Sequence, residues 1–170
     1  MDRDQFRAGM RKLAGGVTII TARDAEGVRC GLTATAVCSL STEPPSLIAC
    51  VNLQSSVARA LQDARHFAVN VLSSGHQRVA ETFAGRHGLA RDERFAHGRW
   101  IEGASGLPIL ADAECSFECE LAEPKAFGTH LILIGHVLHT RSNEGDGAPL
   151  VYGNGNFLAA FAPPALAASA

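Results

Sequence analysis

The chain has 170 residues, of which 46% are hydrophobic and 19% charged, and its formal net charge at pH 7 is -2. This length favours one domain, and we expect a single domain over residues 1–170, with its core at about 6–160 and an Ala/Pro-rich C-terminal tail. The slightly negative charge, the scattered basic residues and the few aromatics argue against a surface that binds nucleic acid.

The N-terminus and the cysteines are typical of a cytoplasmic protein. Residues 1–13 carry charges but no continuous apolar run, so we expect no secretory signal. No segment approaches the ~20 apolar residues that span a bilayer, so we expect no membrane contact. The five cysteines are odd in number and lie in apolar or alternating runs, which favours buried, reduced thiols.

Short apolar runs dominate the chain, and two or three short helices interrupt them. Runs rich in β-branched and apolar residues predict strands over residues 17–21, 31–40, 46–51, 66–72, 113–121, 129–139 and 150–152. Helical spacing predicts a helix over 6–13, one capped by Ser55 or Ser56, and one capped by Ser74. Turns are expected at 24–27, 41–45 and 125–128, and residues 85–103 are predicted to be irregular. Pro44 and Pro45 oppose both helix and ladder pairing.

The segment 113–121 shows the clearest strand pattern. Apolar side chains alternate strictly with Ser116, Glu118 and Glu120, which predicts a half-buried antiparallel strand with a solvated polar face. Six or seven strands at hairpin-like spacing, with no regular β-α-β alternation, indicate a mainly β fold built as an antiparallel barrel or sandwich.

Several well-known motifs are missing from the sequence. It has no G-x-G-x-x-G after a strand, no Walker loop, no G-x-S-x-G and no H-E-x-x-H. A separate Rossmann domain for a nicotinamide cofactor is therefore excluded, and a nicotinamide would have to share a site with another ligand.

Residues 31–56 form the candidate binding segment. Thr33 and Thr35 alternate with Ala34 and Ala36, and such small side chains let a flat ring lie against the backbone. Close packing against a helix or another subunit accounts equally for the same pattern. The serines that follow Asn52, at a predicted helix start, suit a phosphate, although ordinary capping accounts for them too.

The histidines and Arg86 offer weaker signals. His130 and His136 share a strand face but are six residues apart, too far for one metal ion, so we expect no metal site. His130 follows Gly128 at a strand mouth, where it is either a hydrogen-bond donor to a ligand or a structural histidine. Arg86 follows Gly85 and is either a phosphate ligand or a solvated loop charge.

Six segments resemble one known family. They are FRAGMRKLAGGVTIIT, GLTATAVCSLSTEPPSLIACVN, HFAVNVLS, ETFAGR, GTHLILIGHV and PLVYGNGNF. In this order, over residues 6–157, the chain resembles the short-chain flavin reductases, the reductase components of two-component flavin-dependent monooxygenases. The resemblance implies a split antiparallel β-barrel that binds FMN or FAD, uses NADH or NADPH as cosubstrate and works as a homodimer.

The resemblance also implies the site residues. Those expected along the isoalloxazine ring and ribityl chain are Leu32, Thr33, Ala34, Thr35 and Ala36. Those expected at the ribityl and phosphate end are Cys38, Ser39, Asn52, Ser55 and Ser56. Those expected to close the site are Phe83, Gly85 and Arg86, with His130 near the nicotinamide as the catalytic residue and Tyr152 in the covering segment. The family usually has Asp before this histidine, and here the residue is Thr129, which leaves the charge of His130 and the choice between NADH and NADPH open.

The expected function is an NAD(P)H:flavin oxidoreductase that supplies reduced flavin to a partner monooxygenase. The cofactors carry the hydride transfer, so no acid/base pair or nucleophile is required, and His130 is expected to orient the nicotinamide carboxamide. The alternatives are a flavoprotein that retains FMN and reduces another acceptor such as a corrinoid, and a non-catalytic flavin-binding protein. A pyridoxamine-phosphate-oxidase type of barrel and a ligand-free structural barrel are less consistent with the residues.

Overall fold

The computed structural model describes residues 2–55, 57–122, 124–144 and 147–159, which are mainly β. The helices are α1 (Arg3–Met10), α2 (Ala58–Asp63) and α3 (Gln77–Phe83), with 3-10 turns η1 (Ser74–His76) and η2 (Glu93–Ala96). The strands are β1 (Gly15–Gly16), β2 (Thr18–Arg23), β3 (Arg29–Ala34), β4 (Val37–Thr42), β5 (Pro45–Asn52), β6 (His66–Val71), β7 (Trp100–Glu102), β8 (Pro108–Leu110), β9 (Cys115–Leu121), β10 (Lys125–Phe127), β11 (His130–Ser142), β12 (Leu150–Gly153) and β13 (Asn156–Ala159). The predicted antiparallel, mainly β fold is confirmed.

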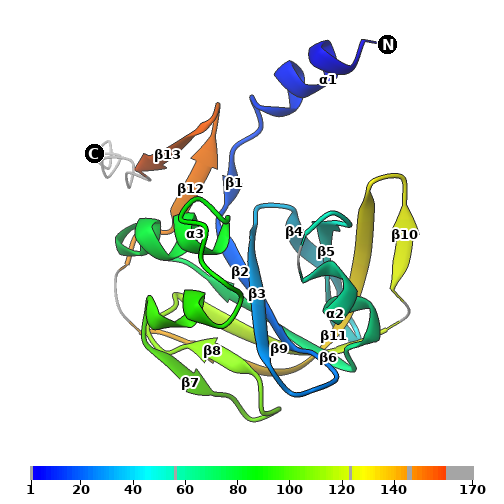
Figure 1. Ribbon diagram of the computed structural model, residues 1–170, viewed down its shortest axis with the longest axis vertical. Coiled ribbons are helices and arrows are strands. Elements are labelled where there is room, and N and C mark those ends of the chain that lie inside the picture. The colour runs from blue at the N-terminus through cyan, green and yellow to red at the C-terminus, as the bar shows by residue number, and fades with distance from the viewer. Residues whose placement is uncertain (1, 56, 123, 145–146, 160–170) are drawn as a thin grey trace, which may run out of the picture.

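One curled sheet organises the molecule (Figure 1). Its strand order is β3-β2-β6-β9-β11-β5-β4, with β10 paired to β11, and every pair is antiparallel. A second sheet joins β1, β12 and β13, and a hairpin joins β7 and β8. Strands β10 and β13, which the sequence did not predict, belong to short hairpins.

The segment 31–40 is two strands, and the prediction of one strand was wrong. β3 ends at Ala34 and β4 begins at Val37, and these strands are the two edges of the curled sheet. Thr35 and Ala36 therefore connect opposite edges in two residues, and the Cys50 N–H donates to the Ala36 carbonyl at 2.9 Å. Alternation of small residues continues through the bend, which is why the break carries no sequence signal.

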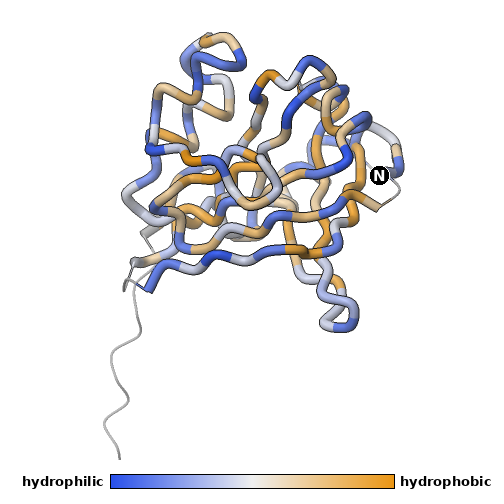
Figure 2. Tube along the Cα trace, turned by 90° about the horizontal axis from the view of Figure 1, so that it is seen from below, coloured by the Kyte–Doolittle hydropathy of each residue, from blue (hydrophilic) through white to orange (hydrophobic). Residues whose placement is uncertain are grey.

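Apolar side chains fill the inside of the curl, and Figure 2 shows apolar colour concentrated in its central strands and polar colour in the outer loops. The largest fully buried members of this core are Ile20, Val51, Val57, Leu61, Phe67, Leu131 and Leu133. Val57 is the N-cap of α2 and Leu61 lies in its middle, so this short helix covers the core as its predicted apolar face requires.

A second cluster holds α3 and the segment 85–103 against the sheet. The rings of Phe83, Phe95 and Trp100 lie 5.0 to 5.2 Å apart in edge and tilted contacts. The Arg29 guanidinium lies 4.8 Å from the centre of the Phe95 ring. The segment predicted to be irregular thus contains η2 and β7, because aromatic packing rather than local propensity fixes it.

A buried amide links β6 to the β7–β8 hairpin. The Asn70 Oδ1 atom accepts from the Leu110 N–H at 2.8 Å and from the Ser116 hydroxyl at 2.9 Å. Its Nδ2 group donates to the Ile19 carbonyl at 3.1 Å and lies 3.4 Å from the Thr21 hydroxyl. Asn70 is fully buried, and these contacts satisfy both ends of its amide.

Two residues on the polar face of β9, Ser116 and Glu118, are buried, whereas the prediction had this face in solvent. Ser116 is 2% exposed and Glu118 4% exposed, because the β7–β8 hairpin covers this face. The Glu118 carboxylate accepts from the N–H groups of Ala104 and Ser105 at 2.9 and 2.6 Å. The alternation pattern predicted that water would solvate this carboxylate, but backbone N–H groups of the hairpin turn take the place of water as its donors.

The helix starts and the proline turn differ from the predictions in detail. Asp2 caps α1, and Ser73, which is hydrogen-bonded to the His76 ring, is the N-cap residue of η1 in place of Ser74. Ser55 accepts from the Val57 N–H at 3.2 Å just before α2, while Ser56 lies outside the described residues. Pro45 pairs with Thr42 as the first residue of β5, where its missing N–H costs no ladder bond.

The cysteines are all free, but only two of the five are buried. Burial raises the pKa of Cys30 to about 11 and that of Cys119 to about 12, so both are neutral thiols at physiological pH. Cys38 is exposed, which contradicts the expectation that all five are buried.

In the described ranges, no helix has the length and apolar character needed to cross a membrane. The predicted fraying of the tail after residue 160 lies outside those ranges.

We expect Asn70→Ala to lower the free energy of unfolding by about 3 kcal/mol, because it leaves the buried Leu110 N–H and its neighbours without partners. Urea denaturation followed by circular dichroism would measure the loss. Asn143→Ala, at an exposed position, is the matched control and should change the free energy by less than about 0.5 kcal/mol. Equal effects of the two substitutions would show that the amide network contributes little.

Candidate functional site

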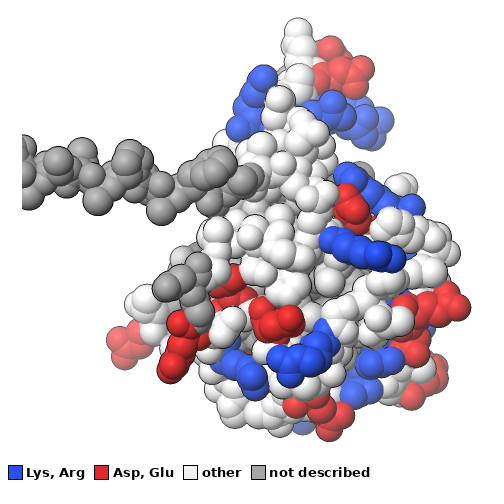
Figure 3. All heavy atoms as spheres, turned by 90° about the vertical axis from the view of Figure 1, so that its left-hand side faces the viewer, with Lys and Arg blue, Asp and Glu red and all other residues white. Residues whose placement is uncertain are grey.

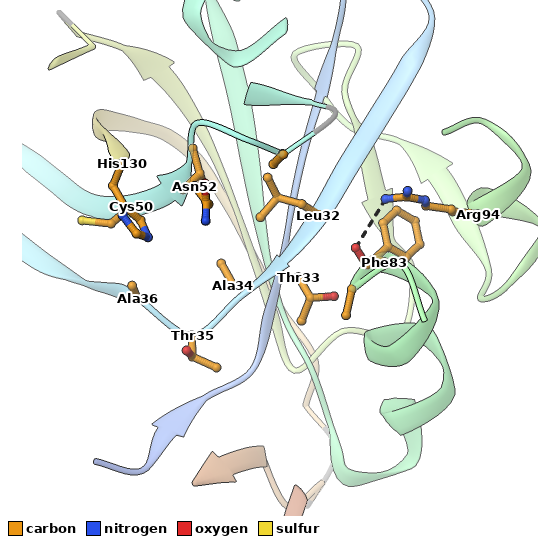
Figure 4. Close-up of a pocket in the computed structure, with 14 residues that line it drawn as sticks. Leu32, Thr33, Ala34, Thr35, Ala36, Cys50, Asn52, Phe83, Arg94 and His130 are labelled. Atoms are coloured by element: carbon orange, nitrogen blue, oxygen red, sulfur yellow. Dashed lines mark hydrogen bonds between the residues drawn. The ribbon is translucent and has the colours of Figure 1, made fainter. Parts of the chain in front are cut away.

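A cavity of about 400 Å³ lies beside β3 and the bend that follows it (Figure 4). Its lining comes from β3 and the bend after it, from the end of β5, from the end of α3, and from single residues of η2 and β11. The lining residues are Leu32, Thr33, Ala34, Thr35, Ala36, Cys50, Val51, Asn52, Ser55, Phe83, Ala84, Gly85, Arg94 and His130. None of them is acidic.

The first wall of the cavity, here called the β3 wall, consists of β3 and the bend after it. Hydrogen bonds engage the Thr33 hydroxyl and the Ala34 carbonyl of this wall. The Thr33 hydroxyl donates to the Ala80 carbonyl of α3 at 2.6 Å, and the Thr18 hydroxyl of β2 donates to the Ala34 carbonyl at 2.9 Å. Gly31 lets Phe83 approach, since a Cβ there would lie 2.9 Å from the Phe83 ring. Small side chains and a closely packed α3 thus leave room beside the backbone.

The second wall joins the end of β5 to the start of β11. His130 is paired with Asn52 in the ladder, and the Leu53 N–H donates to the Thr129 carbonyl at 3.0 Å. The His130 Nδ1 atom lies 2.9 Å from the Thr129 hydroxyl, and both side chains are exposed. The neighbouring hydroxyl therefore occupies one ring nitrogen and leaves Nε2 for a ligand.

The third wall is the turn after α3. Gly85 has φ +81°, a conformation that side chains rarely adopt, and it ends the helix beside the cavity. Arg94 reaches this wall from η2, where its Nε and Nη1 groups donate to the carbonyls of Leu89 and Phe83 at 3.3 and 3.5 Å. Arg94 as a whole is half-buried.

A smaller cavity of about 230 Å³ adjoins the first one and shares Thr33, Ala34, Thr35 and Ala84 with it. Arg86 and Tyr152 line this second cavity together with Phe157. The Arg86 guanidinium lies 3.3 Å from the Glu81 carboxylate and 5.8 Å from the centre of the Phe157 ring. Both cavities thus lie along the same stretch of β3 and its bend.

A match to a family model decides what kind of protein this is. Residues 10–160 match the family described as "Flavin reductase like domain". The chain belongs to the flavin reductase-like family.

Two curated relatives and one solved structure support this membership. The chain is 40% identical over 138 residues to FMN reductase (NADH) RutF of Ancylobacter novellus, covering 81% of this chain and 75% of the relative. It is 37% identical over 150 residues to the 4-hydroxyphenylacetate 3-monooxygenase reductase component of Salmonella typhimurium, covering 88% and 87%. The NADH:FAD oxidoreductase SgcE6 of Streptomyces globisporus C-1027, in complex with NAD and FAD fragments, superimposes with a TM-score of 0.85 at 28% identity, covering 96% and 95%.

Most of the site residues expected of a flavin reductase come together in the larger cavity. It contains Leu32, Thr33, Ala34, Thr35, Ala36, Asn52, Ser55, Phe83, Gly85 and His130. Arg86 and Tyr152 lie in the adjoining cavity, and the exposed β4 residues Cys38 and Ser39 line neither. Nothing is described for Ser56.

Four lining residues were missed: Cys50, Val51, Ala84 and Arg94. The first two belong to a strand that was predicted, and they reach the cavity because β5 lies opposite the bend. Arg94 lies in the segment predicted to be irregular, where no periodicity indicated which side chain turns inward. Among the described residues, no group of three or more His, Cys, Asp or Glu side chains has the arrangement of a metal site.

Proposed function

We propose that this chain is an NAD(P)H-dependent flavin reductase that binds FMN or FAD in the larger cavity. The observation that carries the proposal is a cavity walled by small side chains and lined by no acidic residue, in a chain of the flavin reductase-like family. The name of the RutF relative, FMN reductase (NADH), favours FMN and NADH.

The cavity fits a flavin in size and chemistry. Its volume of about 400 Å³ is within the range of pockets that hold small ligands and cofactors. Ala34 and Ala36 leave space for a flat ring against β3, and Leu32 and Phe83 add apolar contact. Asn52, Ser55 and His130 add polar groups at the opposite wall, and the absence of lining carboxylates suits an anionic ligand.

In this proposal the protein acts mainly by positioning. A bound flavin supplies the ring that takes up a hydride from the reduced nicotinamide. The β3 wall and Phe83 hold the ring and exclude water from it, while His130 Nε2 orients the nicotinamide carboxamide. Because Thr129 has a hydroxyl and no charge, it fixes the orientation of the His130 ring without adding a carboxylate.

The relatives indicate where the reduced flavin goes. One is named as the reductase component of a monooxygenase, and another solved neighbour, BorF, is described as the flavin reductase component of a two-component tryptophan halogenase. We infer that this chain likewise supplies a flavin-dependent oxygenase, by transient contact or through diffusible reduced flavin. Five free cysteines support a reducing compartment such as the cytoplasm.

Purified, flavin-stripped protein should oxidise NADH or NADPH only when FMN, FAD or riboflavin is added, with a rate that rises with flavin concentration. Absorbance at 340 nm measures it. Ala36→Leu, which fills the cavity, should lower the apparent flavin affinity about tenfold or more, while Ala126→Leu, on exposed β10, should not. Tight flavin binding without turnover would contradict the proposal and favour a retained-flavin or purely binding protein.

His130→Ala should raise the KM for NADH about tenfold with a smaller effect on kcat, because it removes a ligand-facing donor. Thr129→Val should change KM in the same direction by about threefold, and Thr129→Ser, which keeps the hydroxyl, should restore it. Steady-state kinetics at saturating flavin separate the two constants. An unchanged KM in His130→Ala would disprove the positioning role.

We propose that the protein is a homodimer in which α1 packs against a second copy. Phe6, Met10 and Leu13 are 52%, 49% and 65% exposed, and α1 has no buried residue. Figures 1 and 3 show α1 projecting from the body, next to a largely uncharged surface. An eight-residue helix is marginal without tertiary contacts, so its apolar side chains need a partner surface.

Met10→Glu should therefore shift the protein from dimer toward monomer in sedimentation velocity, because it places a charge within the packed apolar face. Gln5→Glu adds the same charge to α1 at an exposed polar position and is the matched control. A wild-type protein that sediments as a monomer at micromolar concentration would rule out the dimer.

A further inference from the structure

Arg94 contributes the only permanent charge to the lining of the larger cavity within the described residues. Figure 4 shows its side chain reaching from η2 past Phe83 toward the β3 wall. Two backbone carbonyls, those of Leu89 and Phe83, accept from Nε and Nη1 at 3.3 and 3.5 Å. Because guanidinium has five N–H donors, these two long bonds leave donors for a ligand.

The arginines around Arg94 are already paired. Arg91 lies 2.7 Å from Asp24, Arg29 lies 2.9 Å from Asp92, and Arg86 lies 3.3 Å from Glu81. Over the described ranges, Arg94 has no carboxylate within 4.0 Å, although it is half-buried. The guanidinium of a half-buried arginine on the wall of a cavity without acidic residues is suited to bind an anionic group of the ligand.

The position of Arg94 identifies which part of the ligand it meets. His130 and Arg94 come from opposite sides of the cavity, with β3 passing between them (Figure 4). If the flavin ring lies on the His130 side, where the nicotinamide must reach it, the ribityl chain leads away from His130. The phosphate at the end of that chain then approaches the other side, where Arg94 is.

We propose that Arg94 binds the phosphate of the flavin and makes the site prefer FMN over riboflavin. This rests on the proposed function, because it assumes a flavin in the larger cavity. It replaces the expectation that Asn52 and Ser55 hold the phosphate end, because Asn52 is paired with His130 and lies on the side away from Arg94. The phosphate-binding charge then belongs to a residue that the sequence did not single out. Arg86, the arginine that the sequence did single out, is held by Glu81 and Phe157 in the adjoining cavity.

The test compares the dissociation constants of FMN and riboflavin, measured by quenching of flavin fluorescence in stripped protein. Arg94→Gln should weaken FMN about 10- to 100-fold and riboflavin less than about twofold, because only FMN carries the phosphate. Arg94→Lys keeps the charge and should recover part of the FMN affinity. The dependence of FMN binding on salt concentration should also become shallower in Arg94→Gln.

Two further variants show whether the effect on FMN is specific to Arg94. Arg99→Gln removes the same charge at an exposed position outside both cavities and should leave the FMN to riboflavin ratio unchanged. Arg86→Gln tests the competing arginine, and a selective loss of FMN in that variant, with none in Arg94→Gln, would overturn the proposal. Thermal unfolding of Arg94→Gln reports whether the turn after α3 remains intact.

The outcomes are distinguishable from failure of the proposed function. If the wild-type protein binds no flavin, the proposed function fails. If it binds FMN and riboflavin but Arg94→Gln weakens both equally, Arg94 shapes the cavity and the phosphate assignment is wrong. If Arg94→Gln raises the KM for NADH with riboflavin as acceptor and leaves the FMN to riboflavin ratio unchanged, the guanidinium binds a phosphate of the nicotinamide nucleotide instead.

Discussion

The two-residue connection at Thr35 and Ala36 constrains the rest of the structure. It joins β3 and β4, which are opposite edges of one curled sheet, so the sheet has to bend until those edges meet. The two edges do not pair with each other, and the larger cavity lies between β3 with its bend, the end of β5 and the end of α3. The site is therefore a consequence of how the sheet closes.

The elements around this gap are held by polar and aromatic contacts that lie outside it. Asn70 and Glu118 fix the β7–β8 hairpin to the sheet through buried hydrogen bonds to backbone N–H groups. The hairpin in turn supplies Trp100, which packs against Phe83 and Phe95. Through this chain of contacts a surface hairpin determines where Phe83 and η2 present their side chains to the cavity.

The hydride transfer expected at this site is consistent with the residues that line the cavity. A flavin and a nicotinamide exchange a hydride between themselves, so the protein needs a flat wall, polar groups at the edges and an anion site. The β3 wall has its threonine and backbone groups engaged in hydrogen bonds, while His130 and Arg94 lie on opposite sides of it. In the proposed function, this division assigns the nicotinamide to the side of His130 and the phosphate to the side of Arg94.

The sequence alone determined the mainly β antiparallel class and most strand positions, because alternation, β-branched residues and turn residues act locally. It also indicated segment 31–56 as the candidate binding segment. The resemblance of six segments to flavin reductases supplied most of the lining residues. Only the tertiary structure decided that 31–40 breaks at Thr35, that the polar face of β9 is covered, and that Arg94 lines the cavity in place of Arg86. Each of these depends on contacts between residues distant in sequence, which leave no periodic pattern in the chain.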